Sequence, residues 1–240
     1  ARSLNIGRKL LMRKDDTQFK VEEYEEFYSH HLFRPVKDEV AFSAHRVFPR
    51  IQWALDVAKD IEAKRVLDLG CLEGYTALTL LTHCPSVEYV EGVDLSQEGI
   101  DLANQRVKDK GIKNAKFVQG TVEDWLKWYV KNDIHFDLIC NFELMEHVKD
   151  PELVIELMNK VKTPEGSVII STPDFEAPTF GKNDEKNKCH IRLYTLADED
   201  YEAVNKYGNT RKATSLSKQI GKERIVSMEV YSELINCQYK

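Results

Sequence analysis

Two stretches of the sequence carry side chains that can accept a proton near neutral pH. In "ELMEHV", Glu143, Glu146 and His147 stand at positions i, i+3 and i+4, so they share one face if the stretch is helical. In "NKCHIRLYT", His190 belongs to a long segment that suits a substrate lid. Because a neutral imidazole titrates near working pH, His147 and His190 are candidate general bases, with Glu143 as a third candidate.

The same residue types allow two other interpretations. The oxygen and nitrogen atoms of Glu143, Glu146, His147 and His190 would also suit a divalent metal ion. Alternatively, Glu146 and His147 are solvated or cap the helix that starts in "KDPE", and His190 only pins the lid. A base and a metal ligand differ in one measurable respect, which is whether activity depends on a metal ion.

A glycine-rich stretch, "VLDLGCLEGYT", joins a strand-like run to a helix-like run. Gly70 permits a sharp turn, and Gly74 permits a ligand or a helix to approach closely. A dinucleotide-binding loop has a further glycine where this sequence has Leu72, and it holds a pyrophosphate that Glu73 would repel. No lysine loop of the GKS or GKT type is present either. The stretch therefore predicts a cofactor without phosphates, which the acidic Asp68 also favours.

Asp94 ends the next strand-like run, in "GVDLS". In an open parallel sheet, ligands bind outside the carboxyl ends of the strands, where the strand order reverses. A carboxylate at such a strand end can accept hydrogen bonds from both hydroxyl groups of a ribose. The alternative is that Asp94 only caps the following helix and that the glycines are ordinary turn residues.

Short apolar runs alternate with helix-like stretches through the middle of the chain. The strand-like runs cover 65–70, 87–94, 115–120, 136–141 and 166–172, and the helix-like stretches lie near 75–83, 97–110, 121–131 and 151–162. This alternation indicates βαβ units, a parallel sheet and helices on both faces. Near the C-terminus, "TRKATSLSKQ" and "ERIVSMEVYSE" alternate with period two and predict an antiparallel hairpin. The predicted fold is an α/β sheet of seven mostly parallel strands that this hairpin closes.

Residues 1–62 have a helical pattern. One face carries Tyr24, Phe27, Tyr28, His31 and Leu32, and a second stretch opens at Pro49 with Ile51, Leu55 and Ala58 on one stripe. We expect residues 1–62 to form a cap or lid and residues 63–240 to form the main domain.

Composition narrows the class of protein. The chain has 240 residues, 42% of them hydrophobic, which suffices for one domain with a sizeable core. Its formal net charge of -6 gives no indication of a broad phosphate-binding surface. Five cysteines without CxxC spacing favour a reducing, cytoplasmic location over a disulfide framework or a zinc cluster. The apolar runs are too short to span a bilayer, and the basic start is interpreted as a trimmed or frayed end.

Five motifs resemble those of class I S-adenosylmethionine-dependent methyltransferases, in the order and spacing of that family. They are "VLDLGCLEG", "VEGVDLS", "FVQGTVED", "FDLICNFELMEHVKDPE" and "GSVIISTPD", which lie roughly between residues 60 and 175. The resemblance implies a Rossmann-like fold, S-adenosyl-L-methionine as the cofactor and methyl transfer as the activity.

The resemblance also implies which residues surround the cofactor. The loop 68–74 would lie beside the methionine moiety and the ribose, Asp94 would bind the ribose hydroxyls, and Leu95 would lie against adenine. The residues so implied are Asp68, Gly70, Cys71, Leu72, Glu73, Gly74, Asp94, Leu95, Thr121, Val122 and Glu123 (the last three at the adenine edge), and Asn141 and Phe142 at the sulfonium end. Two departures from the family pattern are Leu72 in place of a glycine and Thr121 in place of a common aspartate. We therefore expect the loop backbone to stand farther from the cofactor, and Thr121, Glu123 or a backbone carbonyl to bond the adenine amine.

Three functions fit these patterns. The first is metal-independent O-methylation of a sugar, a glycan or another small-molecule hydroxyl. The second is metal-dependent 2′-O-methylation of an RNA 3′ end. It is considered because ExxEH with a later histidine resembles the metal site of small-RNA 3′-terminal 2′-O-methyltransferases. The acidic composition and the lack of a basic stripe weigh against RNA as the partner. The third is a non-catalytic cofactor-binding scaffold, which the retained glycines and acids disfavour. The sequence gives no indication of an oligomeric state.

Overall fold

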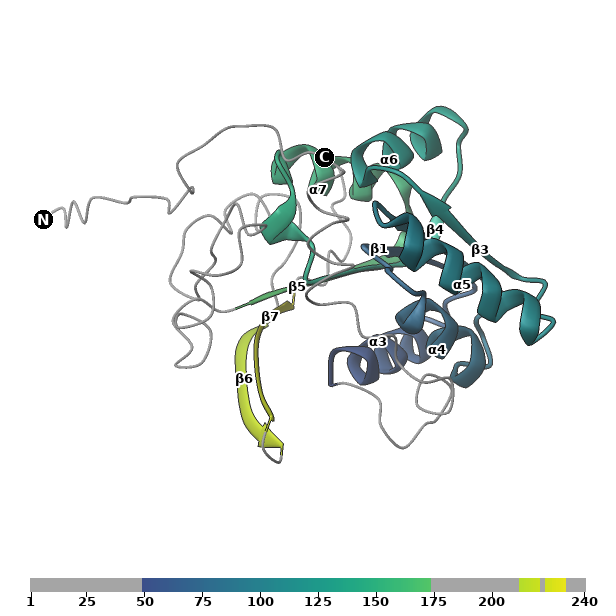
Figure 1. The fold of residues 1–240 in the computed structure, drawn as a ribbon. Helices are drawn as coiled ribbons and strands as arrows, with labels where there is room; N and C mark the ends of the chain where they lie inside the picture. The colour runs from purple at the N-terminus through teal and green to yellow at the C-terminus, as the bar shows by residue number, and fades with distance from the viewer. Residues whose placement is uncertain (1–48, 174–211, 221–222, 232–240) are drawn as a thin grey trace, which may run out of the picture.

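The computed structural model of the chain describes residues 49–173, 212–220 and 223–231 (Figure 1). Five parallel strands form a sheet in the order β3-β2-β1-β4-β5. The strands are β1 (Arg65–Leu69), β2 (Tyr89–Asp94), β3 (Ala115–Gln119), β4 (Phe136–Phe142) and β5 (Lys162–Pro173). The prediction of an α/β fold with a parallel sheet is confirmed; β5 begins earlier than the sequence pattern indicated.

The strand order reverses at β1. The chain adds β2 and β3 on one side of β1, then crosses to the other side and adds β4 and β5. The carboxyl ends of β1 and β4 therefore lie next to each other at the point of reversal, where open α/β sheets hold their ligands.

Helices cover both faces of the sheet (Figure 1). They are α3 (Pro49–Asp60), α4 (Tyr75–His83), α5 (Gln97–Asp109), α6 (Val122–Lys131) and α7 (Pro151–Val161), with a short 3₁₀ turn, η3 (Met145–His147), after β4. Apolar side chains of α3, α4 and α5 share one core with the sheet, and those of α6 and α7 share the other. Burial of these two apolar layers is the main stabilising term for the fold.

Three helices begin where a side-chain oxygen accepts a backbone N–H. Ser96 caps α5 through Gly99 N at 3.1 Å, and Thr121 caps α6 through Asp124 N at 3.1 Å. Asp150 caps α7 through Leu153 N at 3.0 Å, directly before a proline in the first turn. Each bond satisfies a donor that the first helical turn leaves open, so the strand ends are tied to the starts of the helices.

Helix α3 is an integral part of the domain. Its Ala54, Leu55 and Ala58 are buried in the same core as β1 and α4. Part of the segment 1–62 expected to form a cap or lid thus packs into the core of the domain. The division into a cap of residues 1–62 and a main domain of residues 63–240 stays a prediction, since residues 1–48 lie outside the described residues.

Two further strands, β6 (Lys212–Ile220) and β7 (Glu223–Tyr231), pair with each other in antiparallel register along their whole length. Their link to the rest of the sheet consists of two residue pairs between β5 and β7, Thr172 with Met228 and Pro173 with Ser227. In Figure 1 the two strands project away from the helical layers. A seven-stranded sheet closed by this hairpin therefore stays a prediction.

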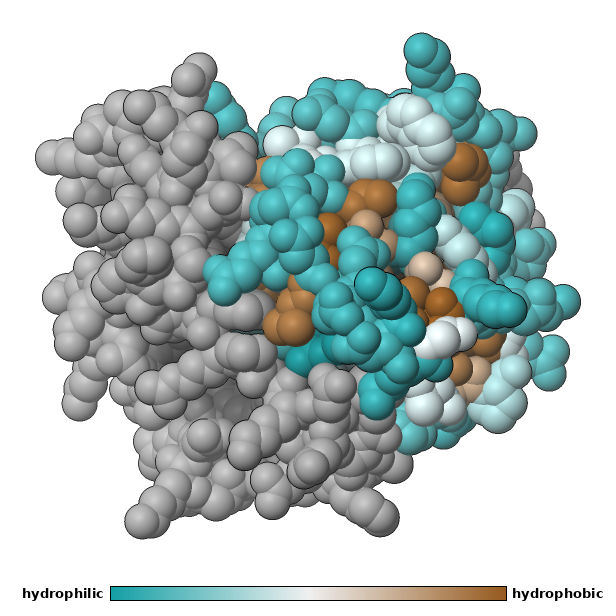
Figure 2. Space-filling view, turned by 45° about the vertical axis from the view of Figure 1, so that its right-hand side comes forward, coloured by the Kyte–Doolittle hydropathy of each residue, from teal (hydrophilic) through white to brown (hydrophobic). Residues whose placement is uncertain are grey.

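Within the described residues, no helix is both long and apolar enough to cross a membrane. Among the described residues visible in Figure 2, hydrophilic side chains dominate the surface and apolar side chains form smaller patches.

Candidate cofactor and catalytic site

The loop between β1 and α4 is held against the end of β2. The backbone N–H groups of Gly70 and Cys71 donate to the carbonyl oxygen of Val93, at 2.9 and 3.1 Å. Gly70 has φ +73°, which an L side chain rarely adopts, and Leu144 lies where its Cβ would point. The sharp turn predicted at Gly70 is therefore present at the carboxyl edge of the sheet.

Leu72, the residue in place of a glycine, also has a left-handed backbone, with φ +46°. Its N–H donates to Asp94 Oδ2 at 2.7 Å, and its backbone lies against Gly99 at the start of α5. The loop thus keeps the conformation for which a glycine is normally used, and the bond to Asp94 offsets part of the strain.

Gly74 serves the packing of the domain. It has φ +74°, and a Cβ there would lie 2.6 Å from the ring of Phe117 and 3.2 Å from Ala103. The sequence left open whether a ligand or a helix approaches this glycine. The close neighbours in the structure are β3 and α5.

Asp94 is 3% exposed, and both of its carboxylate oxygens accept backbone hydrogen bonds. Oδ2 accepts from Leu72 N at 2.7 Å, and Oδ1 accepts from Ser96 N at 2.8 Å. These two bonds hold the carboxylate at the end of β2, between the loop and the start of α5. The side chain that caps α5 is Ser96 rather than Asp94.

Asp68 lies on β1 beneath the loop and is 2% exposed. Its pKa is raised from 3.8 to about 7, chiefly by burial and also by the nearby Asp94 carboxylate, while the Ala77 N–H and Arg50 act in the opposite direction. Ala77 N donates to Asp68 Oδ2 at 3.2 Å. The site therefore holds two buried carboxyl groups whose charged forms a cationic ligand would stabilise.

Glu73 does not present its charge to a ligand. Its Oε2 lies 2.8 Å from Arg106 Nη2, and Arg106 Nη1 donates to the Glu73 carbonyl oxygen at 2.9 Å. Both side chains are buried. The interpretation that Glu73 repels a phosphate is wrong, because Arg106, 33 residues away along the chain, neutralises the carboxylate. Cys71 is also buried, and burial raises the pKa of its thiol.

The expected adenine edge lies where β2 and β3 end. Leu95 follows β2, and the Thr121 hydroxyl, already an acceptor for Asp124 N, can still donate one hydrogen bond. Val122 is buried and Glu123 is partly exposed in the first turn of α6. Gln119 and Trp125 also contact this edge through the Leu95 and Gln119 carbonyl oxygens, and no sequence motif marks these two residues as part of the site.

Asn141 and Phe142 end β4, beside the end of β1. Asn141 is fully buried, and its Nδ2 lies 3.3 Å from Met145 Sδ and 3.8 Å from Met158 Sδ. Its Oδ1 has no hydrogen-bond partner among the described residues. Phe142 is 8% exposed.

Glu143, Glu146 and His147 do not share the face of an α-helix. Glu143 has φ +52°, and only residues 145–147 form a single 3₁₀ turn, so the helical spacing does not apply. The Glu143 carboxylate accepts a hydrogen bond from Ser171 Oγ at 2.8 Å, at the end of β5. His147 Nε2 lies 3.9 Å from Glu146 Oε1, and both side chains are nearly buried.

The metal interpretation requires the side chains of Glu143, Glu146, His147 and His190 to lie around one ion. Among the residues that the structure describes, no group of three or more His, Cys, Asp or Glu side chains is arranged to hold a metal ion. His190, the fourth ligand and the second candidate base, lies outside the described residues. The roles of His147, His190 and Glu143 therefore stay predictions.

Comparisons with known proteins bear on this site. A family model described as a methyltransferase domain matches residues 61–228. The ubiquinone biosynthesis O-methyltransferase of Vibrio atlanticus (strain LGP32) is 31% identical over 131 residues, which are 53% of this chain and 52% of that protein. The chain spans about half the length of the curated relatives it matches.

Solved structures share the fold. A SAM dependent methyltransferase from Aquifex aeolicus has a TM-score of 0.60 at 14% identity, over 91% of this chain and 100% of that chain. The YcgJ protein from Bacillus subtilis has a TM-score of 0.52 at 24% identity, over 65% and 66% of the two chains. At these identities the likeness concerns the fold alone.

The parallel sheet, its point of reversal and the glycine loop beside two strand-end acids define a Rossmann-like S-adenosylmethionine-dependent methyltransferase domain. The chain belongs to the methyltransferase-domain family. The predicted family, enzyme class and cofactor are thereby confirmed.

Proposed function

We propose that the protein transfers a methyl group from S-adenosylmethionine to a hydroxyl oxygen of a small-molecule acceptor, with sugars and glycans as the first candidates. The observation that carries this proposal is the 31% identity to a curated O-methyltransferase. A hydroxyl acceptor must lose a proton as the methyl group arrives, and the 3₁₀ turn after β4 carries His147 beside Glu146.

The described residues fit the cofactor chemically. S-Adenosylmethionine carries a cationic sulfonium and a cationic ammonium group. Asp68 and Asp94 supply buried acidic groups at the carboxyl edge of the sheet, and the positive charge of Arg106 is already paired with Glu73. We place the ribose hydroxyls on Asp94, the adenine edge along 121–123, and the sulfonium end near Asn141.

His147 is the proposed general base. The cofactor supplies a methyl group that is already activated, so the protein has to align the acceptor and remove its proton. The Glu146 carboxylate, 3.9 Å from His147 Nε2, would stabilise the imidazolium that proton capture produces. His190 is proposed as a second base from the segment after β5, and Glu143, fixed by Ser171, as a group that orients the acceptor.

Asp94→Ala tests the placement of the ribose. We expect the dissociation constant of S-adenosylhomocysteine, measured by calorimetry, to rise at least about tenfold, because charge-assisted hydrogen bonds are lost. Asp101→Ala, an exposed acid on α5, is the control and should leave the constant unchanged. A folded Asp94→Ala protein with wild-type affinity would remove Asp94 from the site.

An acceptor screen tests the reaction. Radiolabelled S-adenosylmethionine is incubated with sugars, glycans, hydroxylated aromatic compounds and RNA 3′ ends, each with and without EDTA. The proposal expects label in a small-molecule hydroxyl compound, EDTA without effect, and lower turnover in His147→Ala and in His190→Ala. Loss of turnover in EDTA with recovery in Mg²⁺ or Mn²⁺ would favour the metal-dependent RNA enzyme. Cofactor binding by calorimetry without label in any acceptor would favour the non-catalytic cofactor-binding scaffold.

A further inference from the structure

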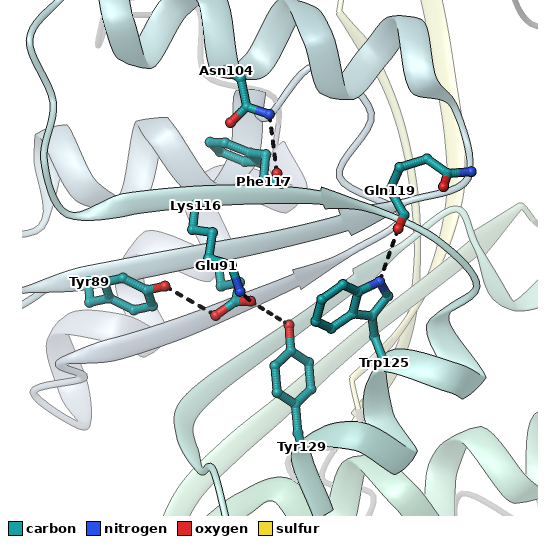
Figure 3. Close-up of polar contacts among 8 residues, drawn as sticks. All are labelled: Tyr89, Glu91, Asn104, Lys116, Phe117, Gln119, Trp125 and Tyr129. Atoms are coloured by element: carbon teal, nitrogen blue, oxygen red, sulfur yellow. Dashed lines mark hydrogen bonds and ion pairs between the residues drawn. The ribbon is translucent and has the colours of Figure 1, made fainter. Parts of the chain in front are cut away.

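A continuous series of contacts leads from the middle of β2 to the carboxyl ends of β2 and β3 (Figure 3). It starts at Glu91, a carboxylate that is 4% exposed on β2. Glu91 Oε1 lies 2.7 Å from Lys116 Nζ and accepts from Tyr129 Oη at 2.8 Å, while Oε2 accepts from Tyr89 Oη at 3.1 Å. The Glu91 carboxylate, which accepts from the two tyrosines, holds the Lys116 ammonium in one place, although the Lys116 side chain is 45% exposed.

Lys116 in turn lies over Trp125 of α6. Its Nζ is 5.2 Å from the centre of the Trp125 ring, within the range of a cation–π contact. The Nε1 edge of the indole lies close to Gly120, where a Cβ would lie 2.7 Å from Trp125 Nε1. Gly120 has φ +151°, so a side chain there would meet both strain and the indole. Trp125 thus contacts both the Lys116 cation and the turn that follows β3.

Trp125 and Gln119 then join the two strand ends. Trp125 Nε1 donates to the Gln119 carbonyl oxygen at 3.1 Å, and Gln119 Nε2 donates to the Leu95 carbonyl oxygen at 3.1 Å. Gly120 N donates to the Asp94 carbonyl oxygen at 2.9 Å. The backbone around Leu95 and the backbone around Thr121 are therefore set by the same few bonds.

We infer that Trp125 and Gln119 are positioning residues that hold the adenine-binding edge at the distance its ring requires. The inference rests on the proposed placement of the cofactor, in which Leu95 lies against one face of adenine and residues 121–123 lie along its edge. Because Trp125 acts on the backbone through its indole N–H, loss of that donor shifts the edge.

The test compares two tryptophans of the same helix. Trp125→Phe keeps an aromatic ring at this position but removes the donor to Gln119. Trp128→Phe changes a ring that is 43% exposed. Calorimetry with S-adenosylhomocysteine should give a dissociation constant about three- to tenfold higher for Trp125→Phe, as loss of one hydrogen bond predicts. Trp128→Phe should bind as the wild type does.

Discrimination at the adenine ring separates positioning from general destabilisation. S-Inosylhomocysteine, in which an oxo group replaces the amine, serves as the second ligand. The inference expects the wild-type preference for the adenine ligand to fall in Trp125→Phe. An equal loss of affinity for both ligands with a lower melting temperature, or no wild-type preference, would overturn it.

Gln119→Ala tests the same series of contacts without altering a buried side chain. Gln119 is exposed, so the fold should persist, and the loss of the bond to Leu95 should again weaken S-adenosylhomocysteine and reduce the preference. Wild-type affinity and preference in both Trp125→Phe and Gln119→Ala would overturn the inference. If Asp94→Ala also left affinity unchanged, the proposed cofactor placement would fail; if only Asp94→Ala weakened binding, the inference alone would fail.

Discussion

Asp68 links the stability of the domain to pH. Its pKa is about 7 in the folded chain, raised chiefly by burial, against 3.8 for an unperturbed aspartate. Between these two values the unfolded chain loses the proton while the folded chain keeps it. The contribution of Asp68 to stability is therefore fully present below about pH 4 and is lost as the pH rises through about 7.

Asp68→Asn should remove this dependence, because the amide keeps an acceptor for Ala77 N and does not ionise. We expect the variant to gain stability relative to the wild type as the pH rises from 4 to 8, by up to about 4 kcal/mol. Urea unfolding of both proteins at several pH values measures the difference. A difference that does not change with pH would show that Asp68 does not titrate in this range.

Asp68 should also make cofactor affinity depend on pH. A cationic ligand favours the ionised carboxyl group, so binding below pH 7 requires the release of a proton. The affinity of the wild type for S-adenosylmethionine should therefore rise between pH 6 and 8, and that of Asp68→Asn should rise less. Calorimetry in buffers of different ionisation enthalpy reports the proton release directly.

At the scale of elements, Gly74 decides how closely β3 and α5 approach the loop. A matched comparison is possible with Gly111, which has a similar φ of +63° but nothing within 4 Å of its Cβ position. Gly111→Ala should cost about 1 kcal/mol from backbone strain alone. Gly74→Ala adds the clash with Phe117 and should cost about 1–3 kcal/mol more. Equal losses of unfolding free energy would show that the Phe117 ring moves aside freely.

Glu91 ties β2 to α6 and β3 through three partners. Burial together with the Glu91 carboxylate raises the pKa of Tyr89 to about 12 and that of Tyr129 further, so both phenols remain donors. In Glu91→Gln an amide replaces the carboxylate that accepts from the two phenols and from Lys116. We expect this variant to have a free energy of unfolding about 1–3 kcal/mol lower than that of the wild type.

Glu88→Gln is the control for that variant. Glu88 pairs with Lys64 at 3.7 Å, but both side chains are more than half exposed, so the change should lie within about 0.5 kcal/mol. Chemical denaturation of the two variants under the same conditions gives the comparison. A loss at Glu91 no larger than that at Glu88 would contradict a stabilising role for the buried network.

At the scale of the whole molecule, the attachment of β6 and β7 to β5 decides whether the sheet has seven strands. Two residue pairs join β7 to β5, whereas β6 and β7 pair along nine positions. If the hairpin closes a seven-stranded sheet, the amides of 212–220 and 223–231 should exchange with solvent as slowly as those of β5. Exchange at the rate of an unstructured chain would show that the sheet ends at β5.

The local structure of the domain could be predicted from the sequence. Short apolar runs and helical patterns predicted β1 to β4 and α4 to α7 to within a few residues, because these patterns report which side chains face the core. The start of α7 was marked by Asp150 before Pro151, and the cofactor loop by Gly70 and Gly74. The five motifs that resemble class I S-adenosylmethionine-dependent methyltransferases predicted the family, which the comparisons confirm.

Contacts between distant segments were decided only by the tertiary structure. The sequence gives no indication that Arg106 neutralises Glu73, or that Trp125 bonds the turn after β3, because these pairs depend on how α5 and α6 lie on the sheet. It also misled at Glu143, where a spacing of three and four residues suggested a helix. The chain leaves β4 there in a left-handed turn, since the Glu143 N–H donates to the Ser171 carbonyl oxygen on the neighbouring strand. The sequence by itself thus determined the elements and the cofactor class, whereas packing across the sheet determined which charges are neutralised and how the strand ends are held.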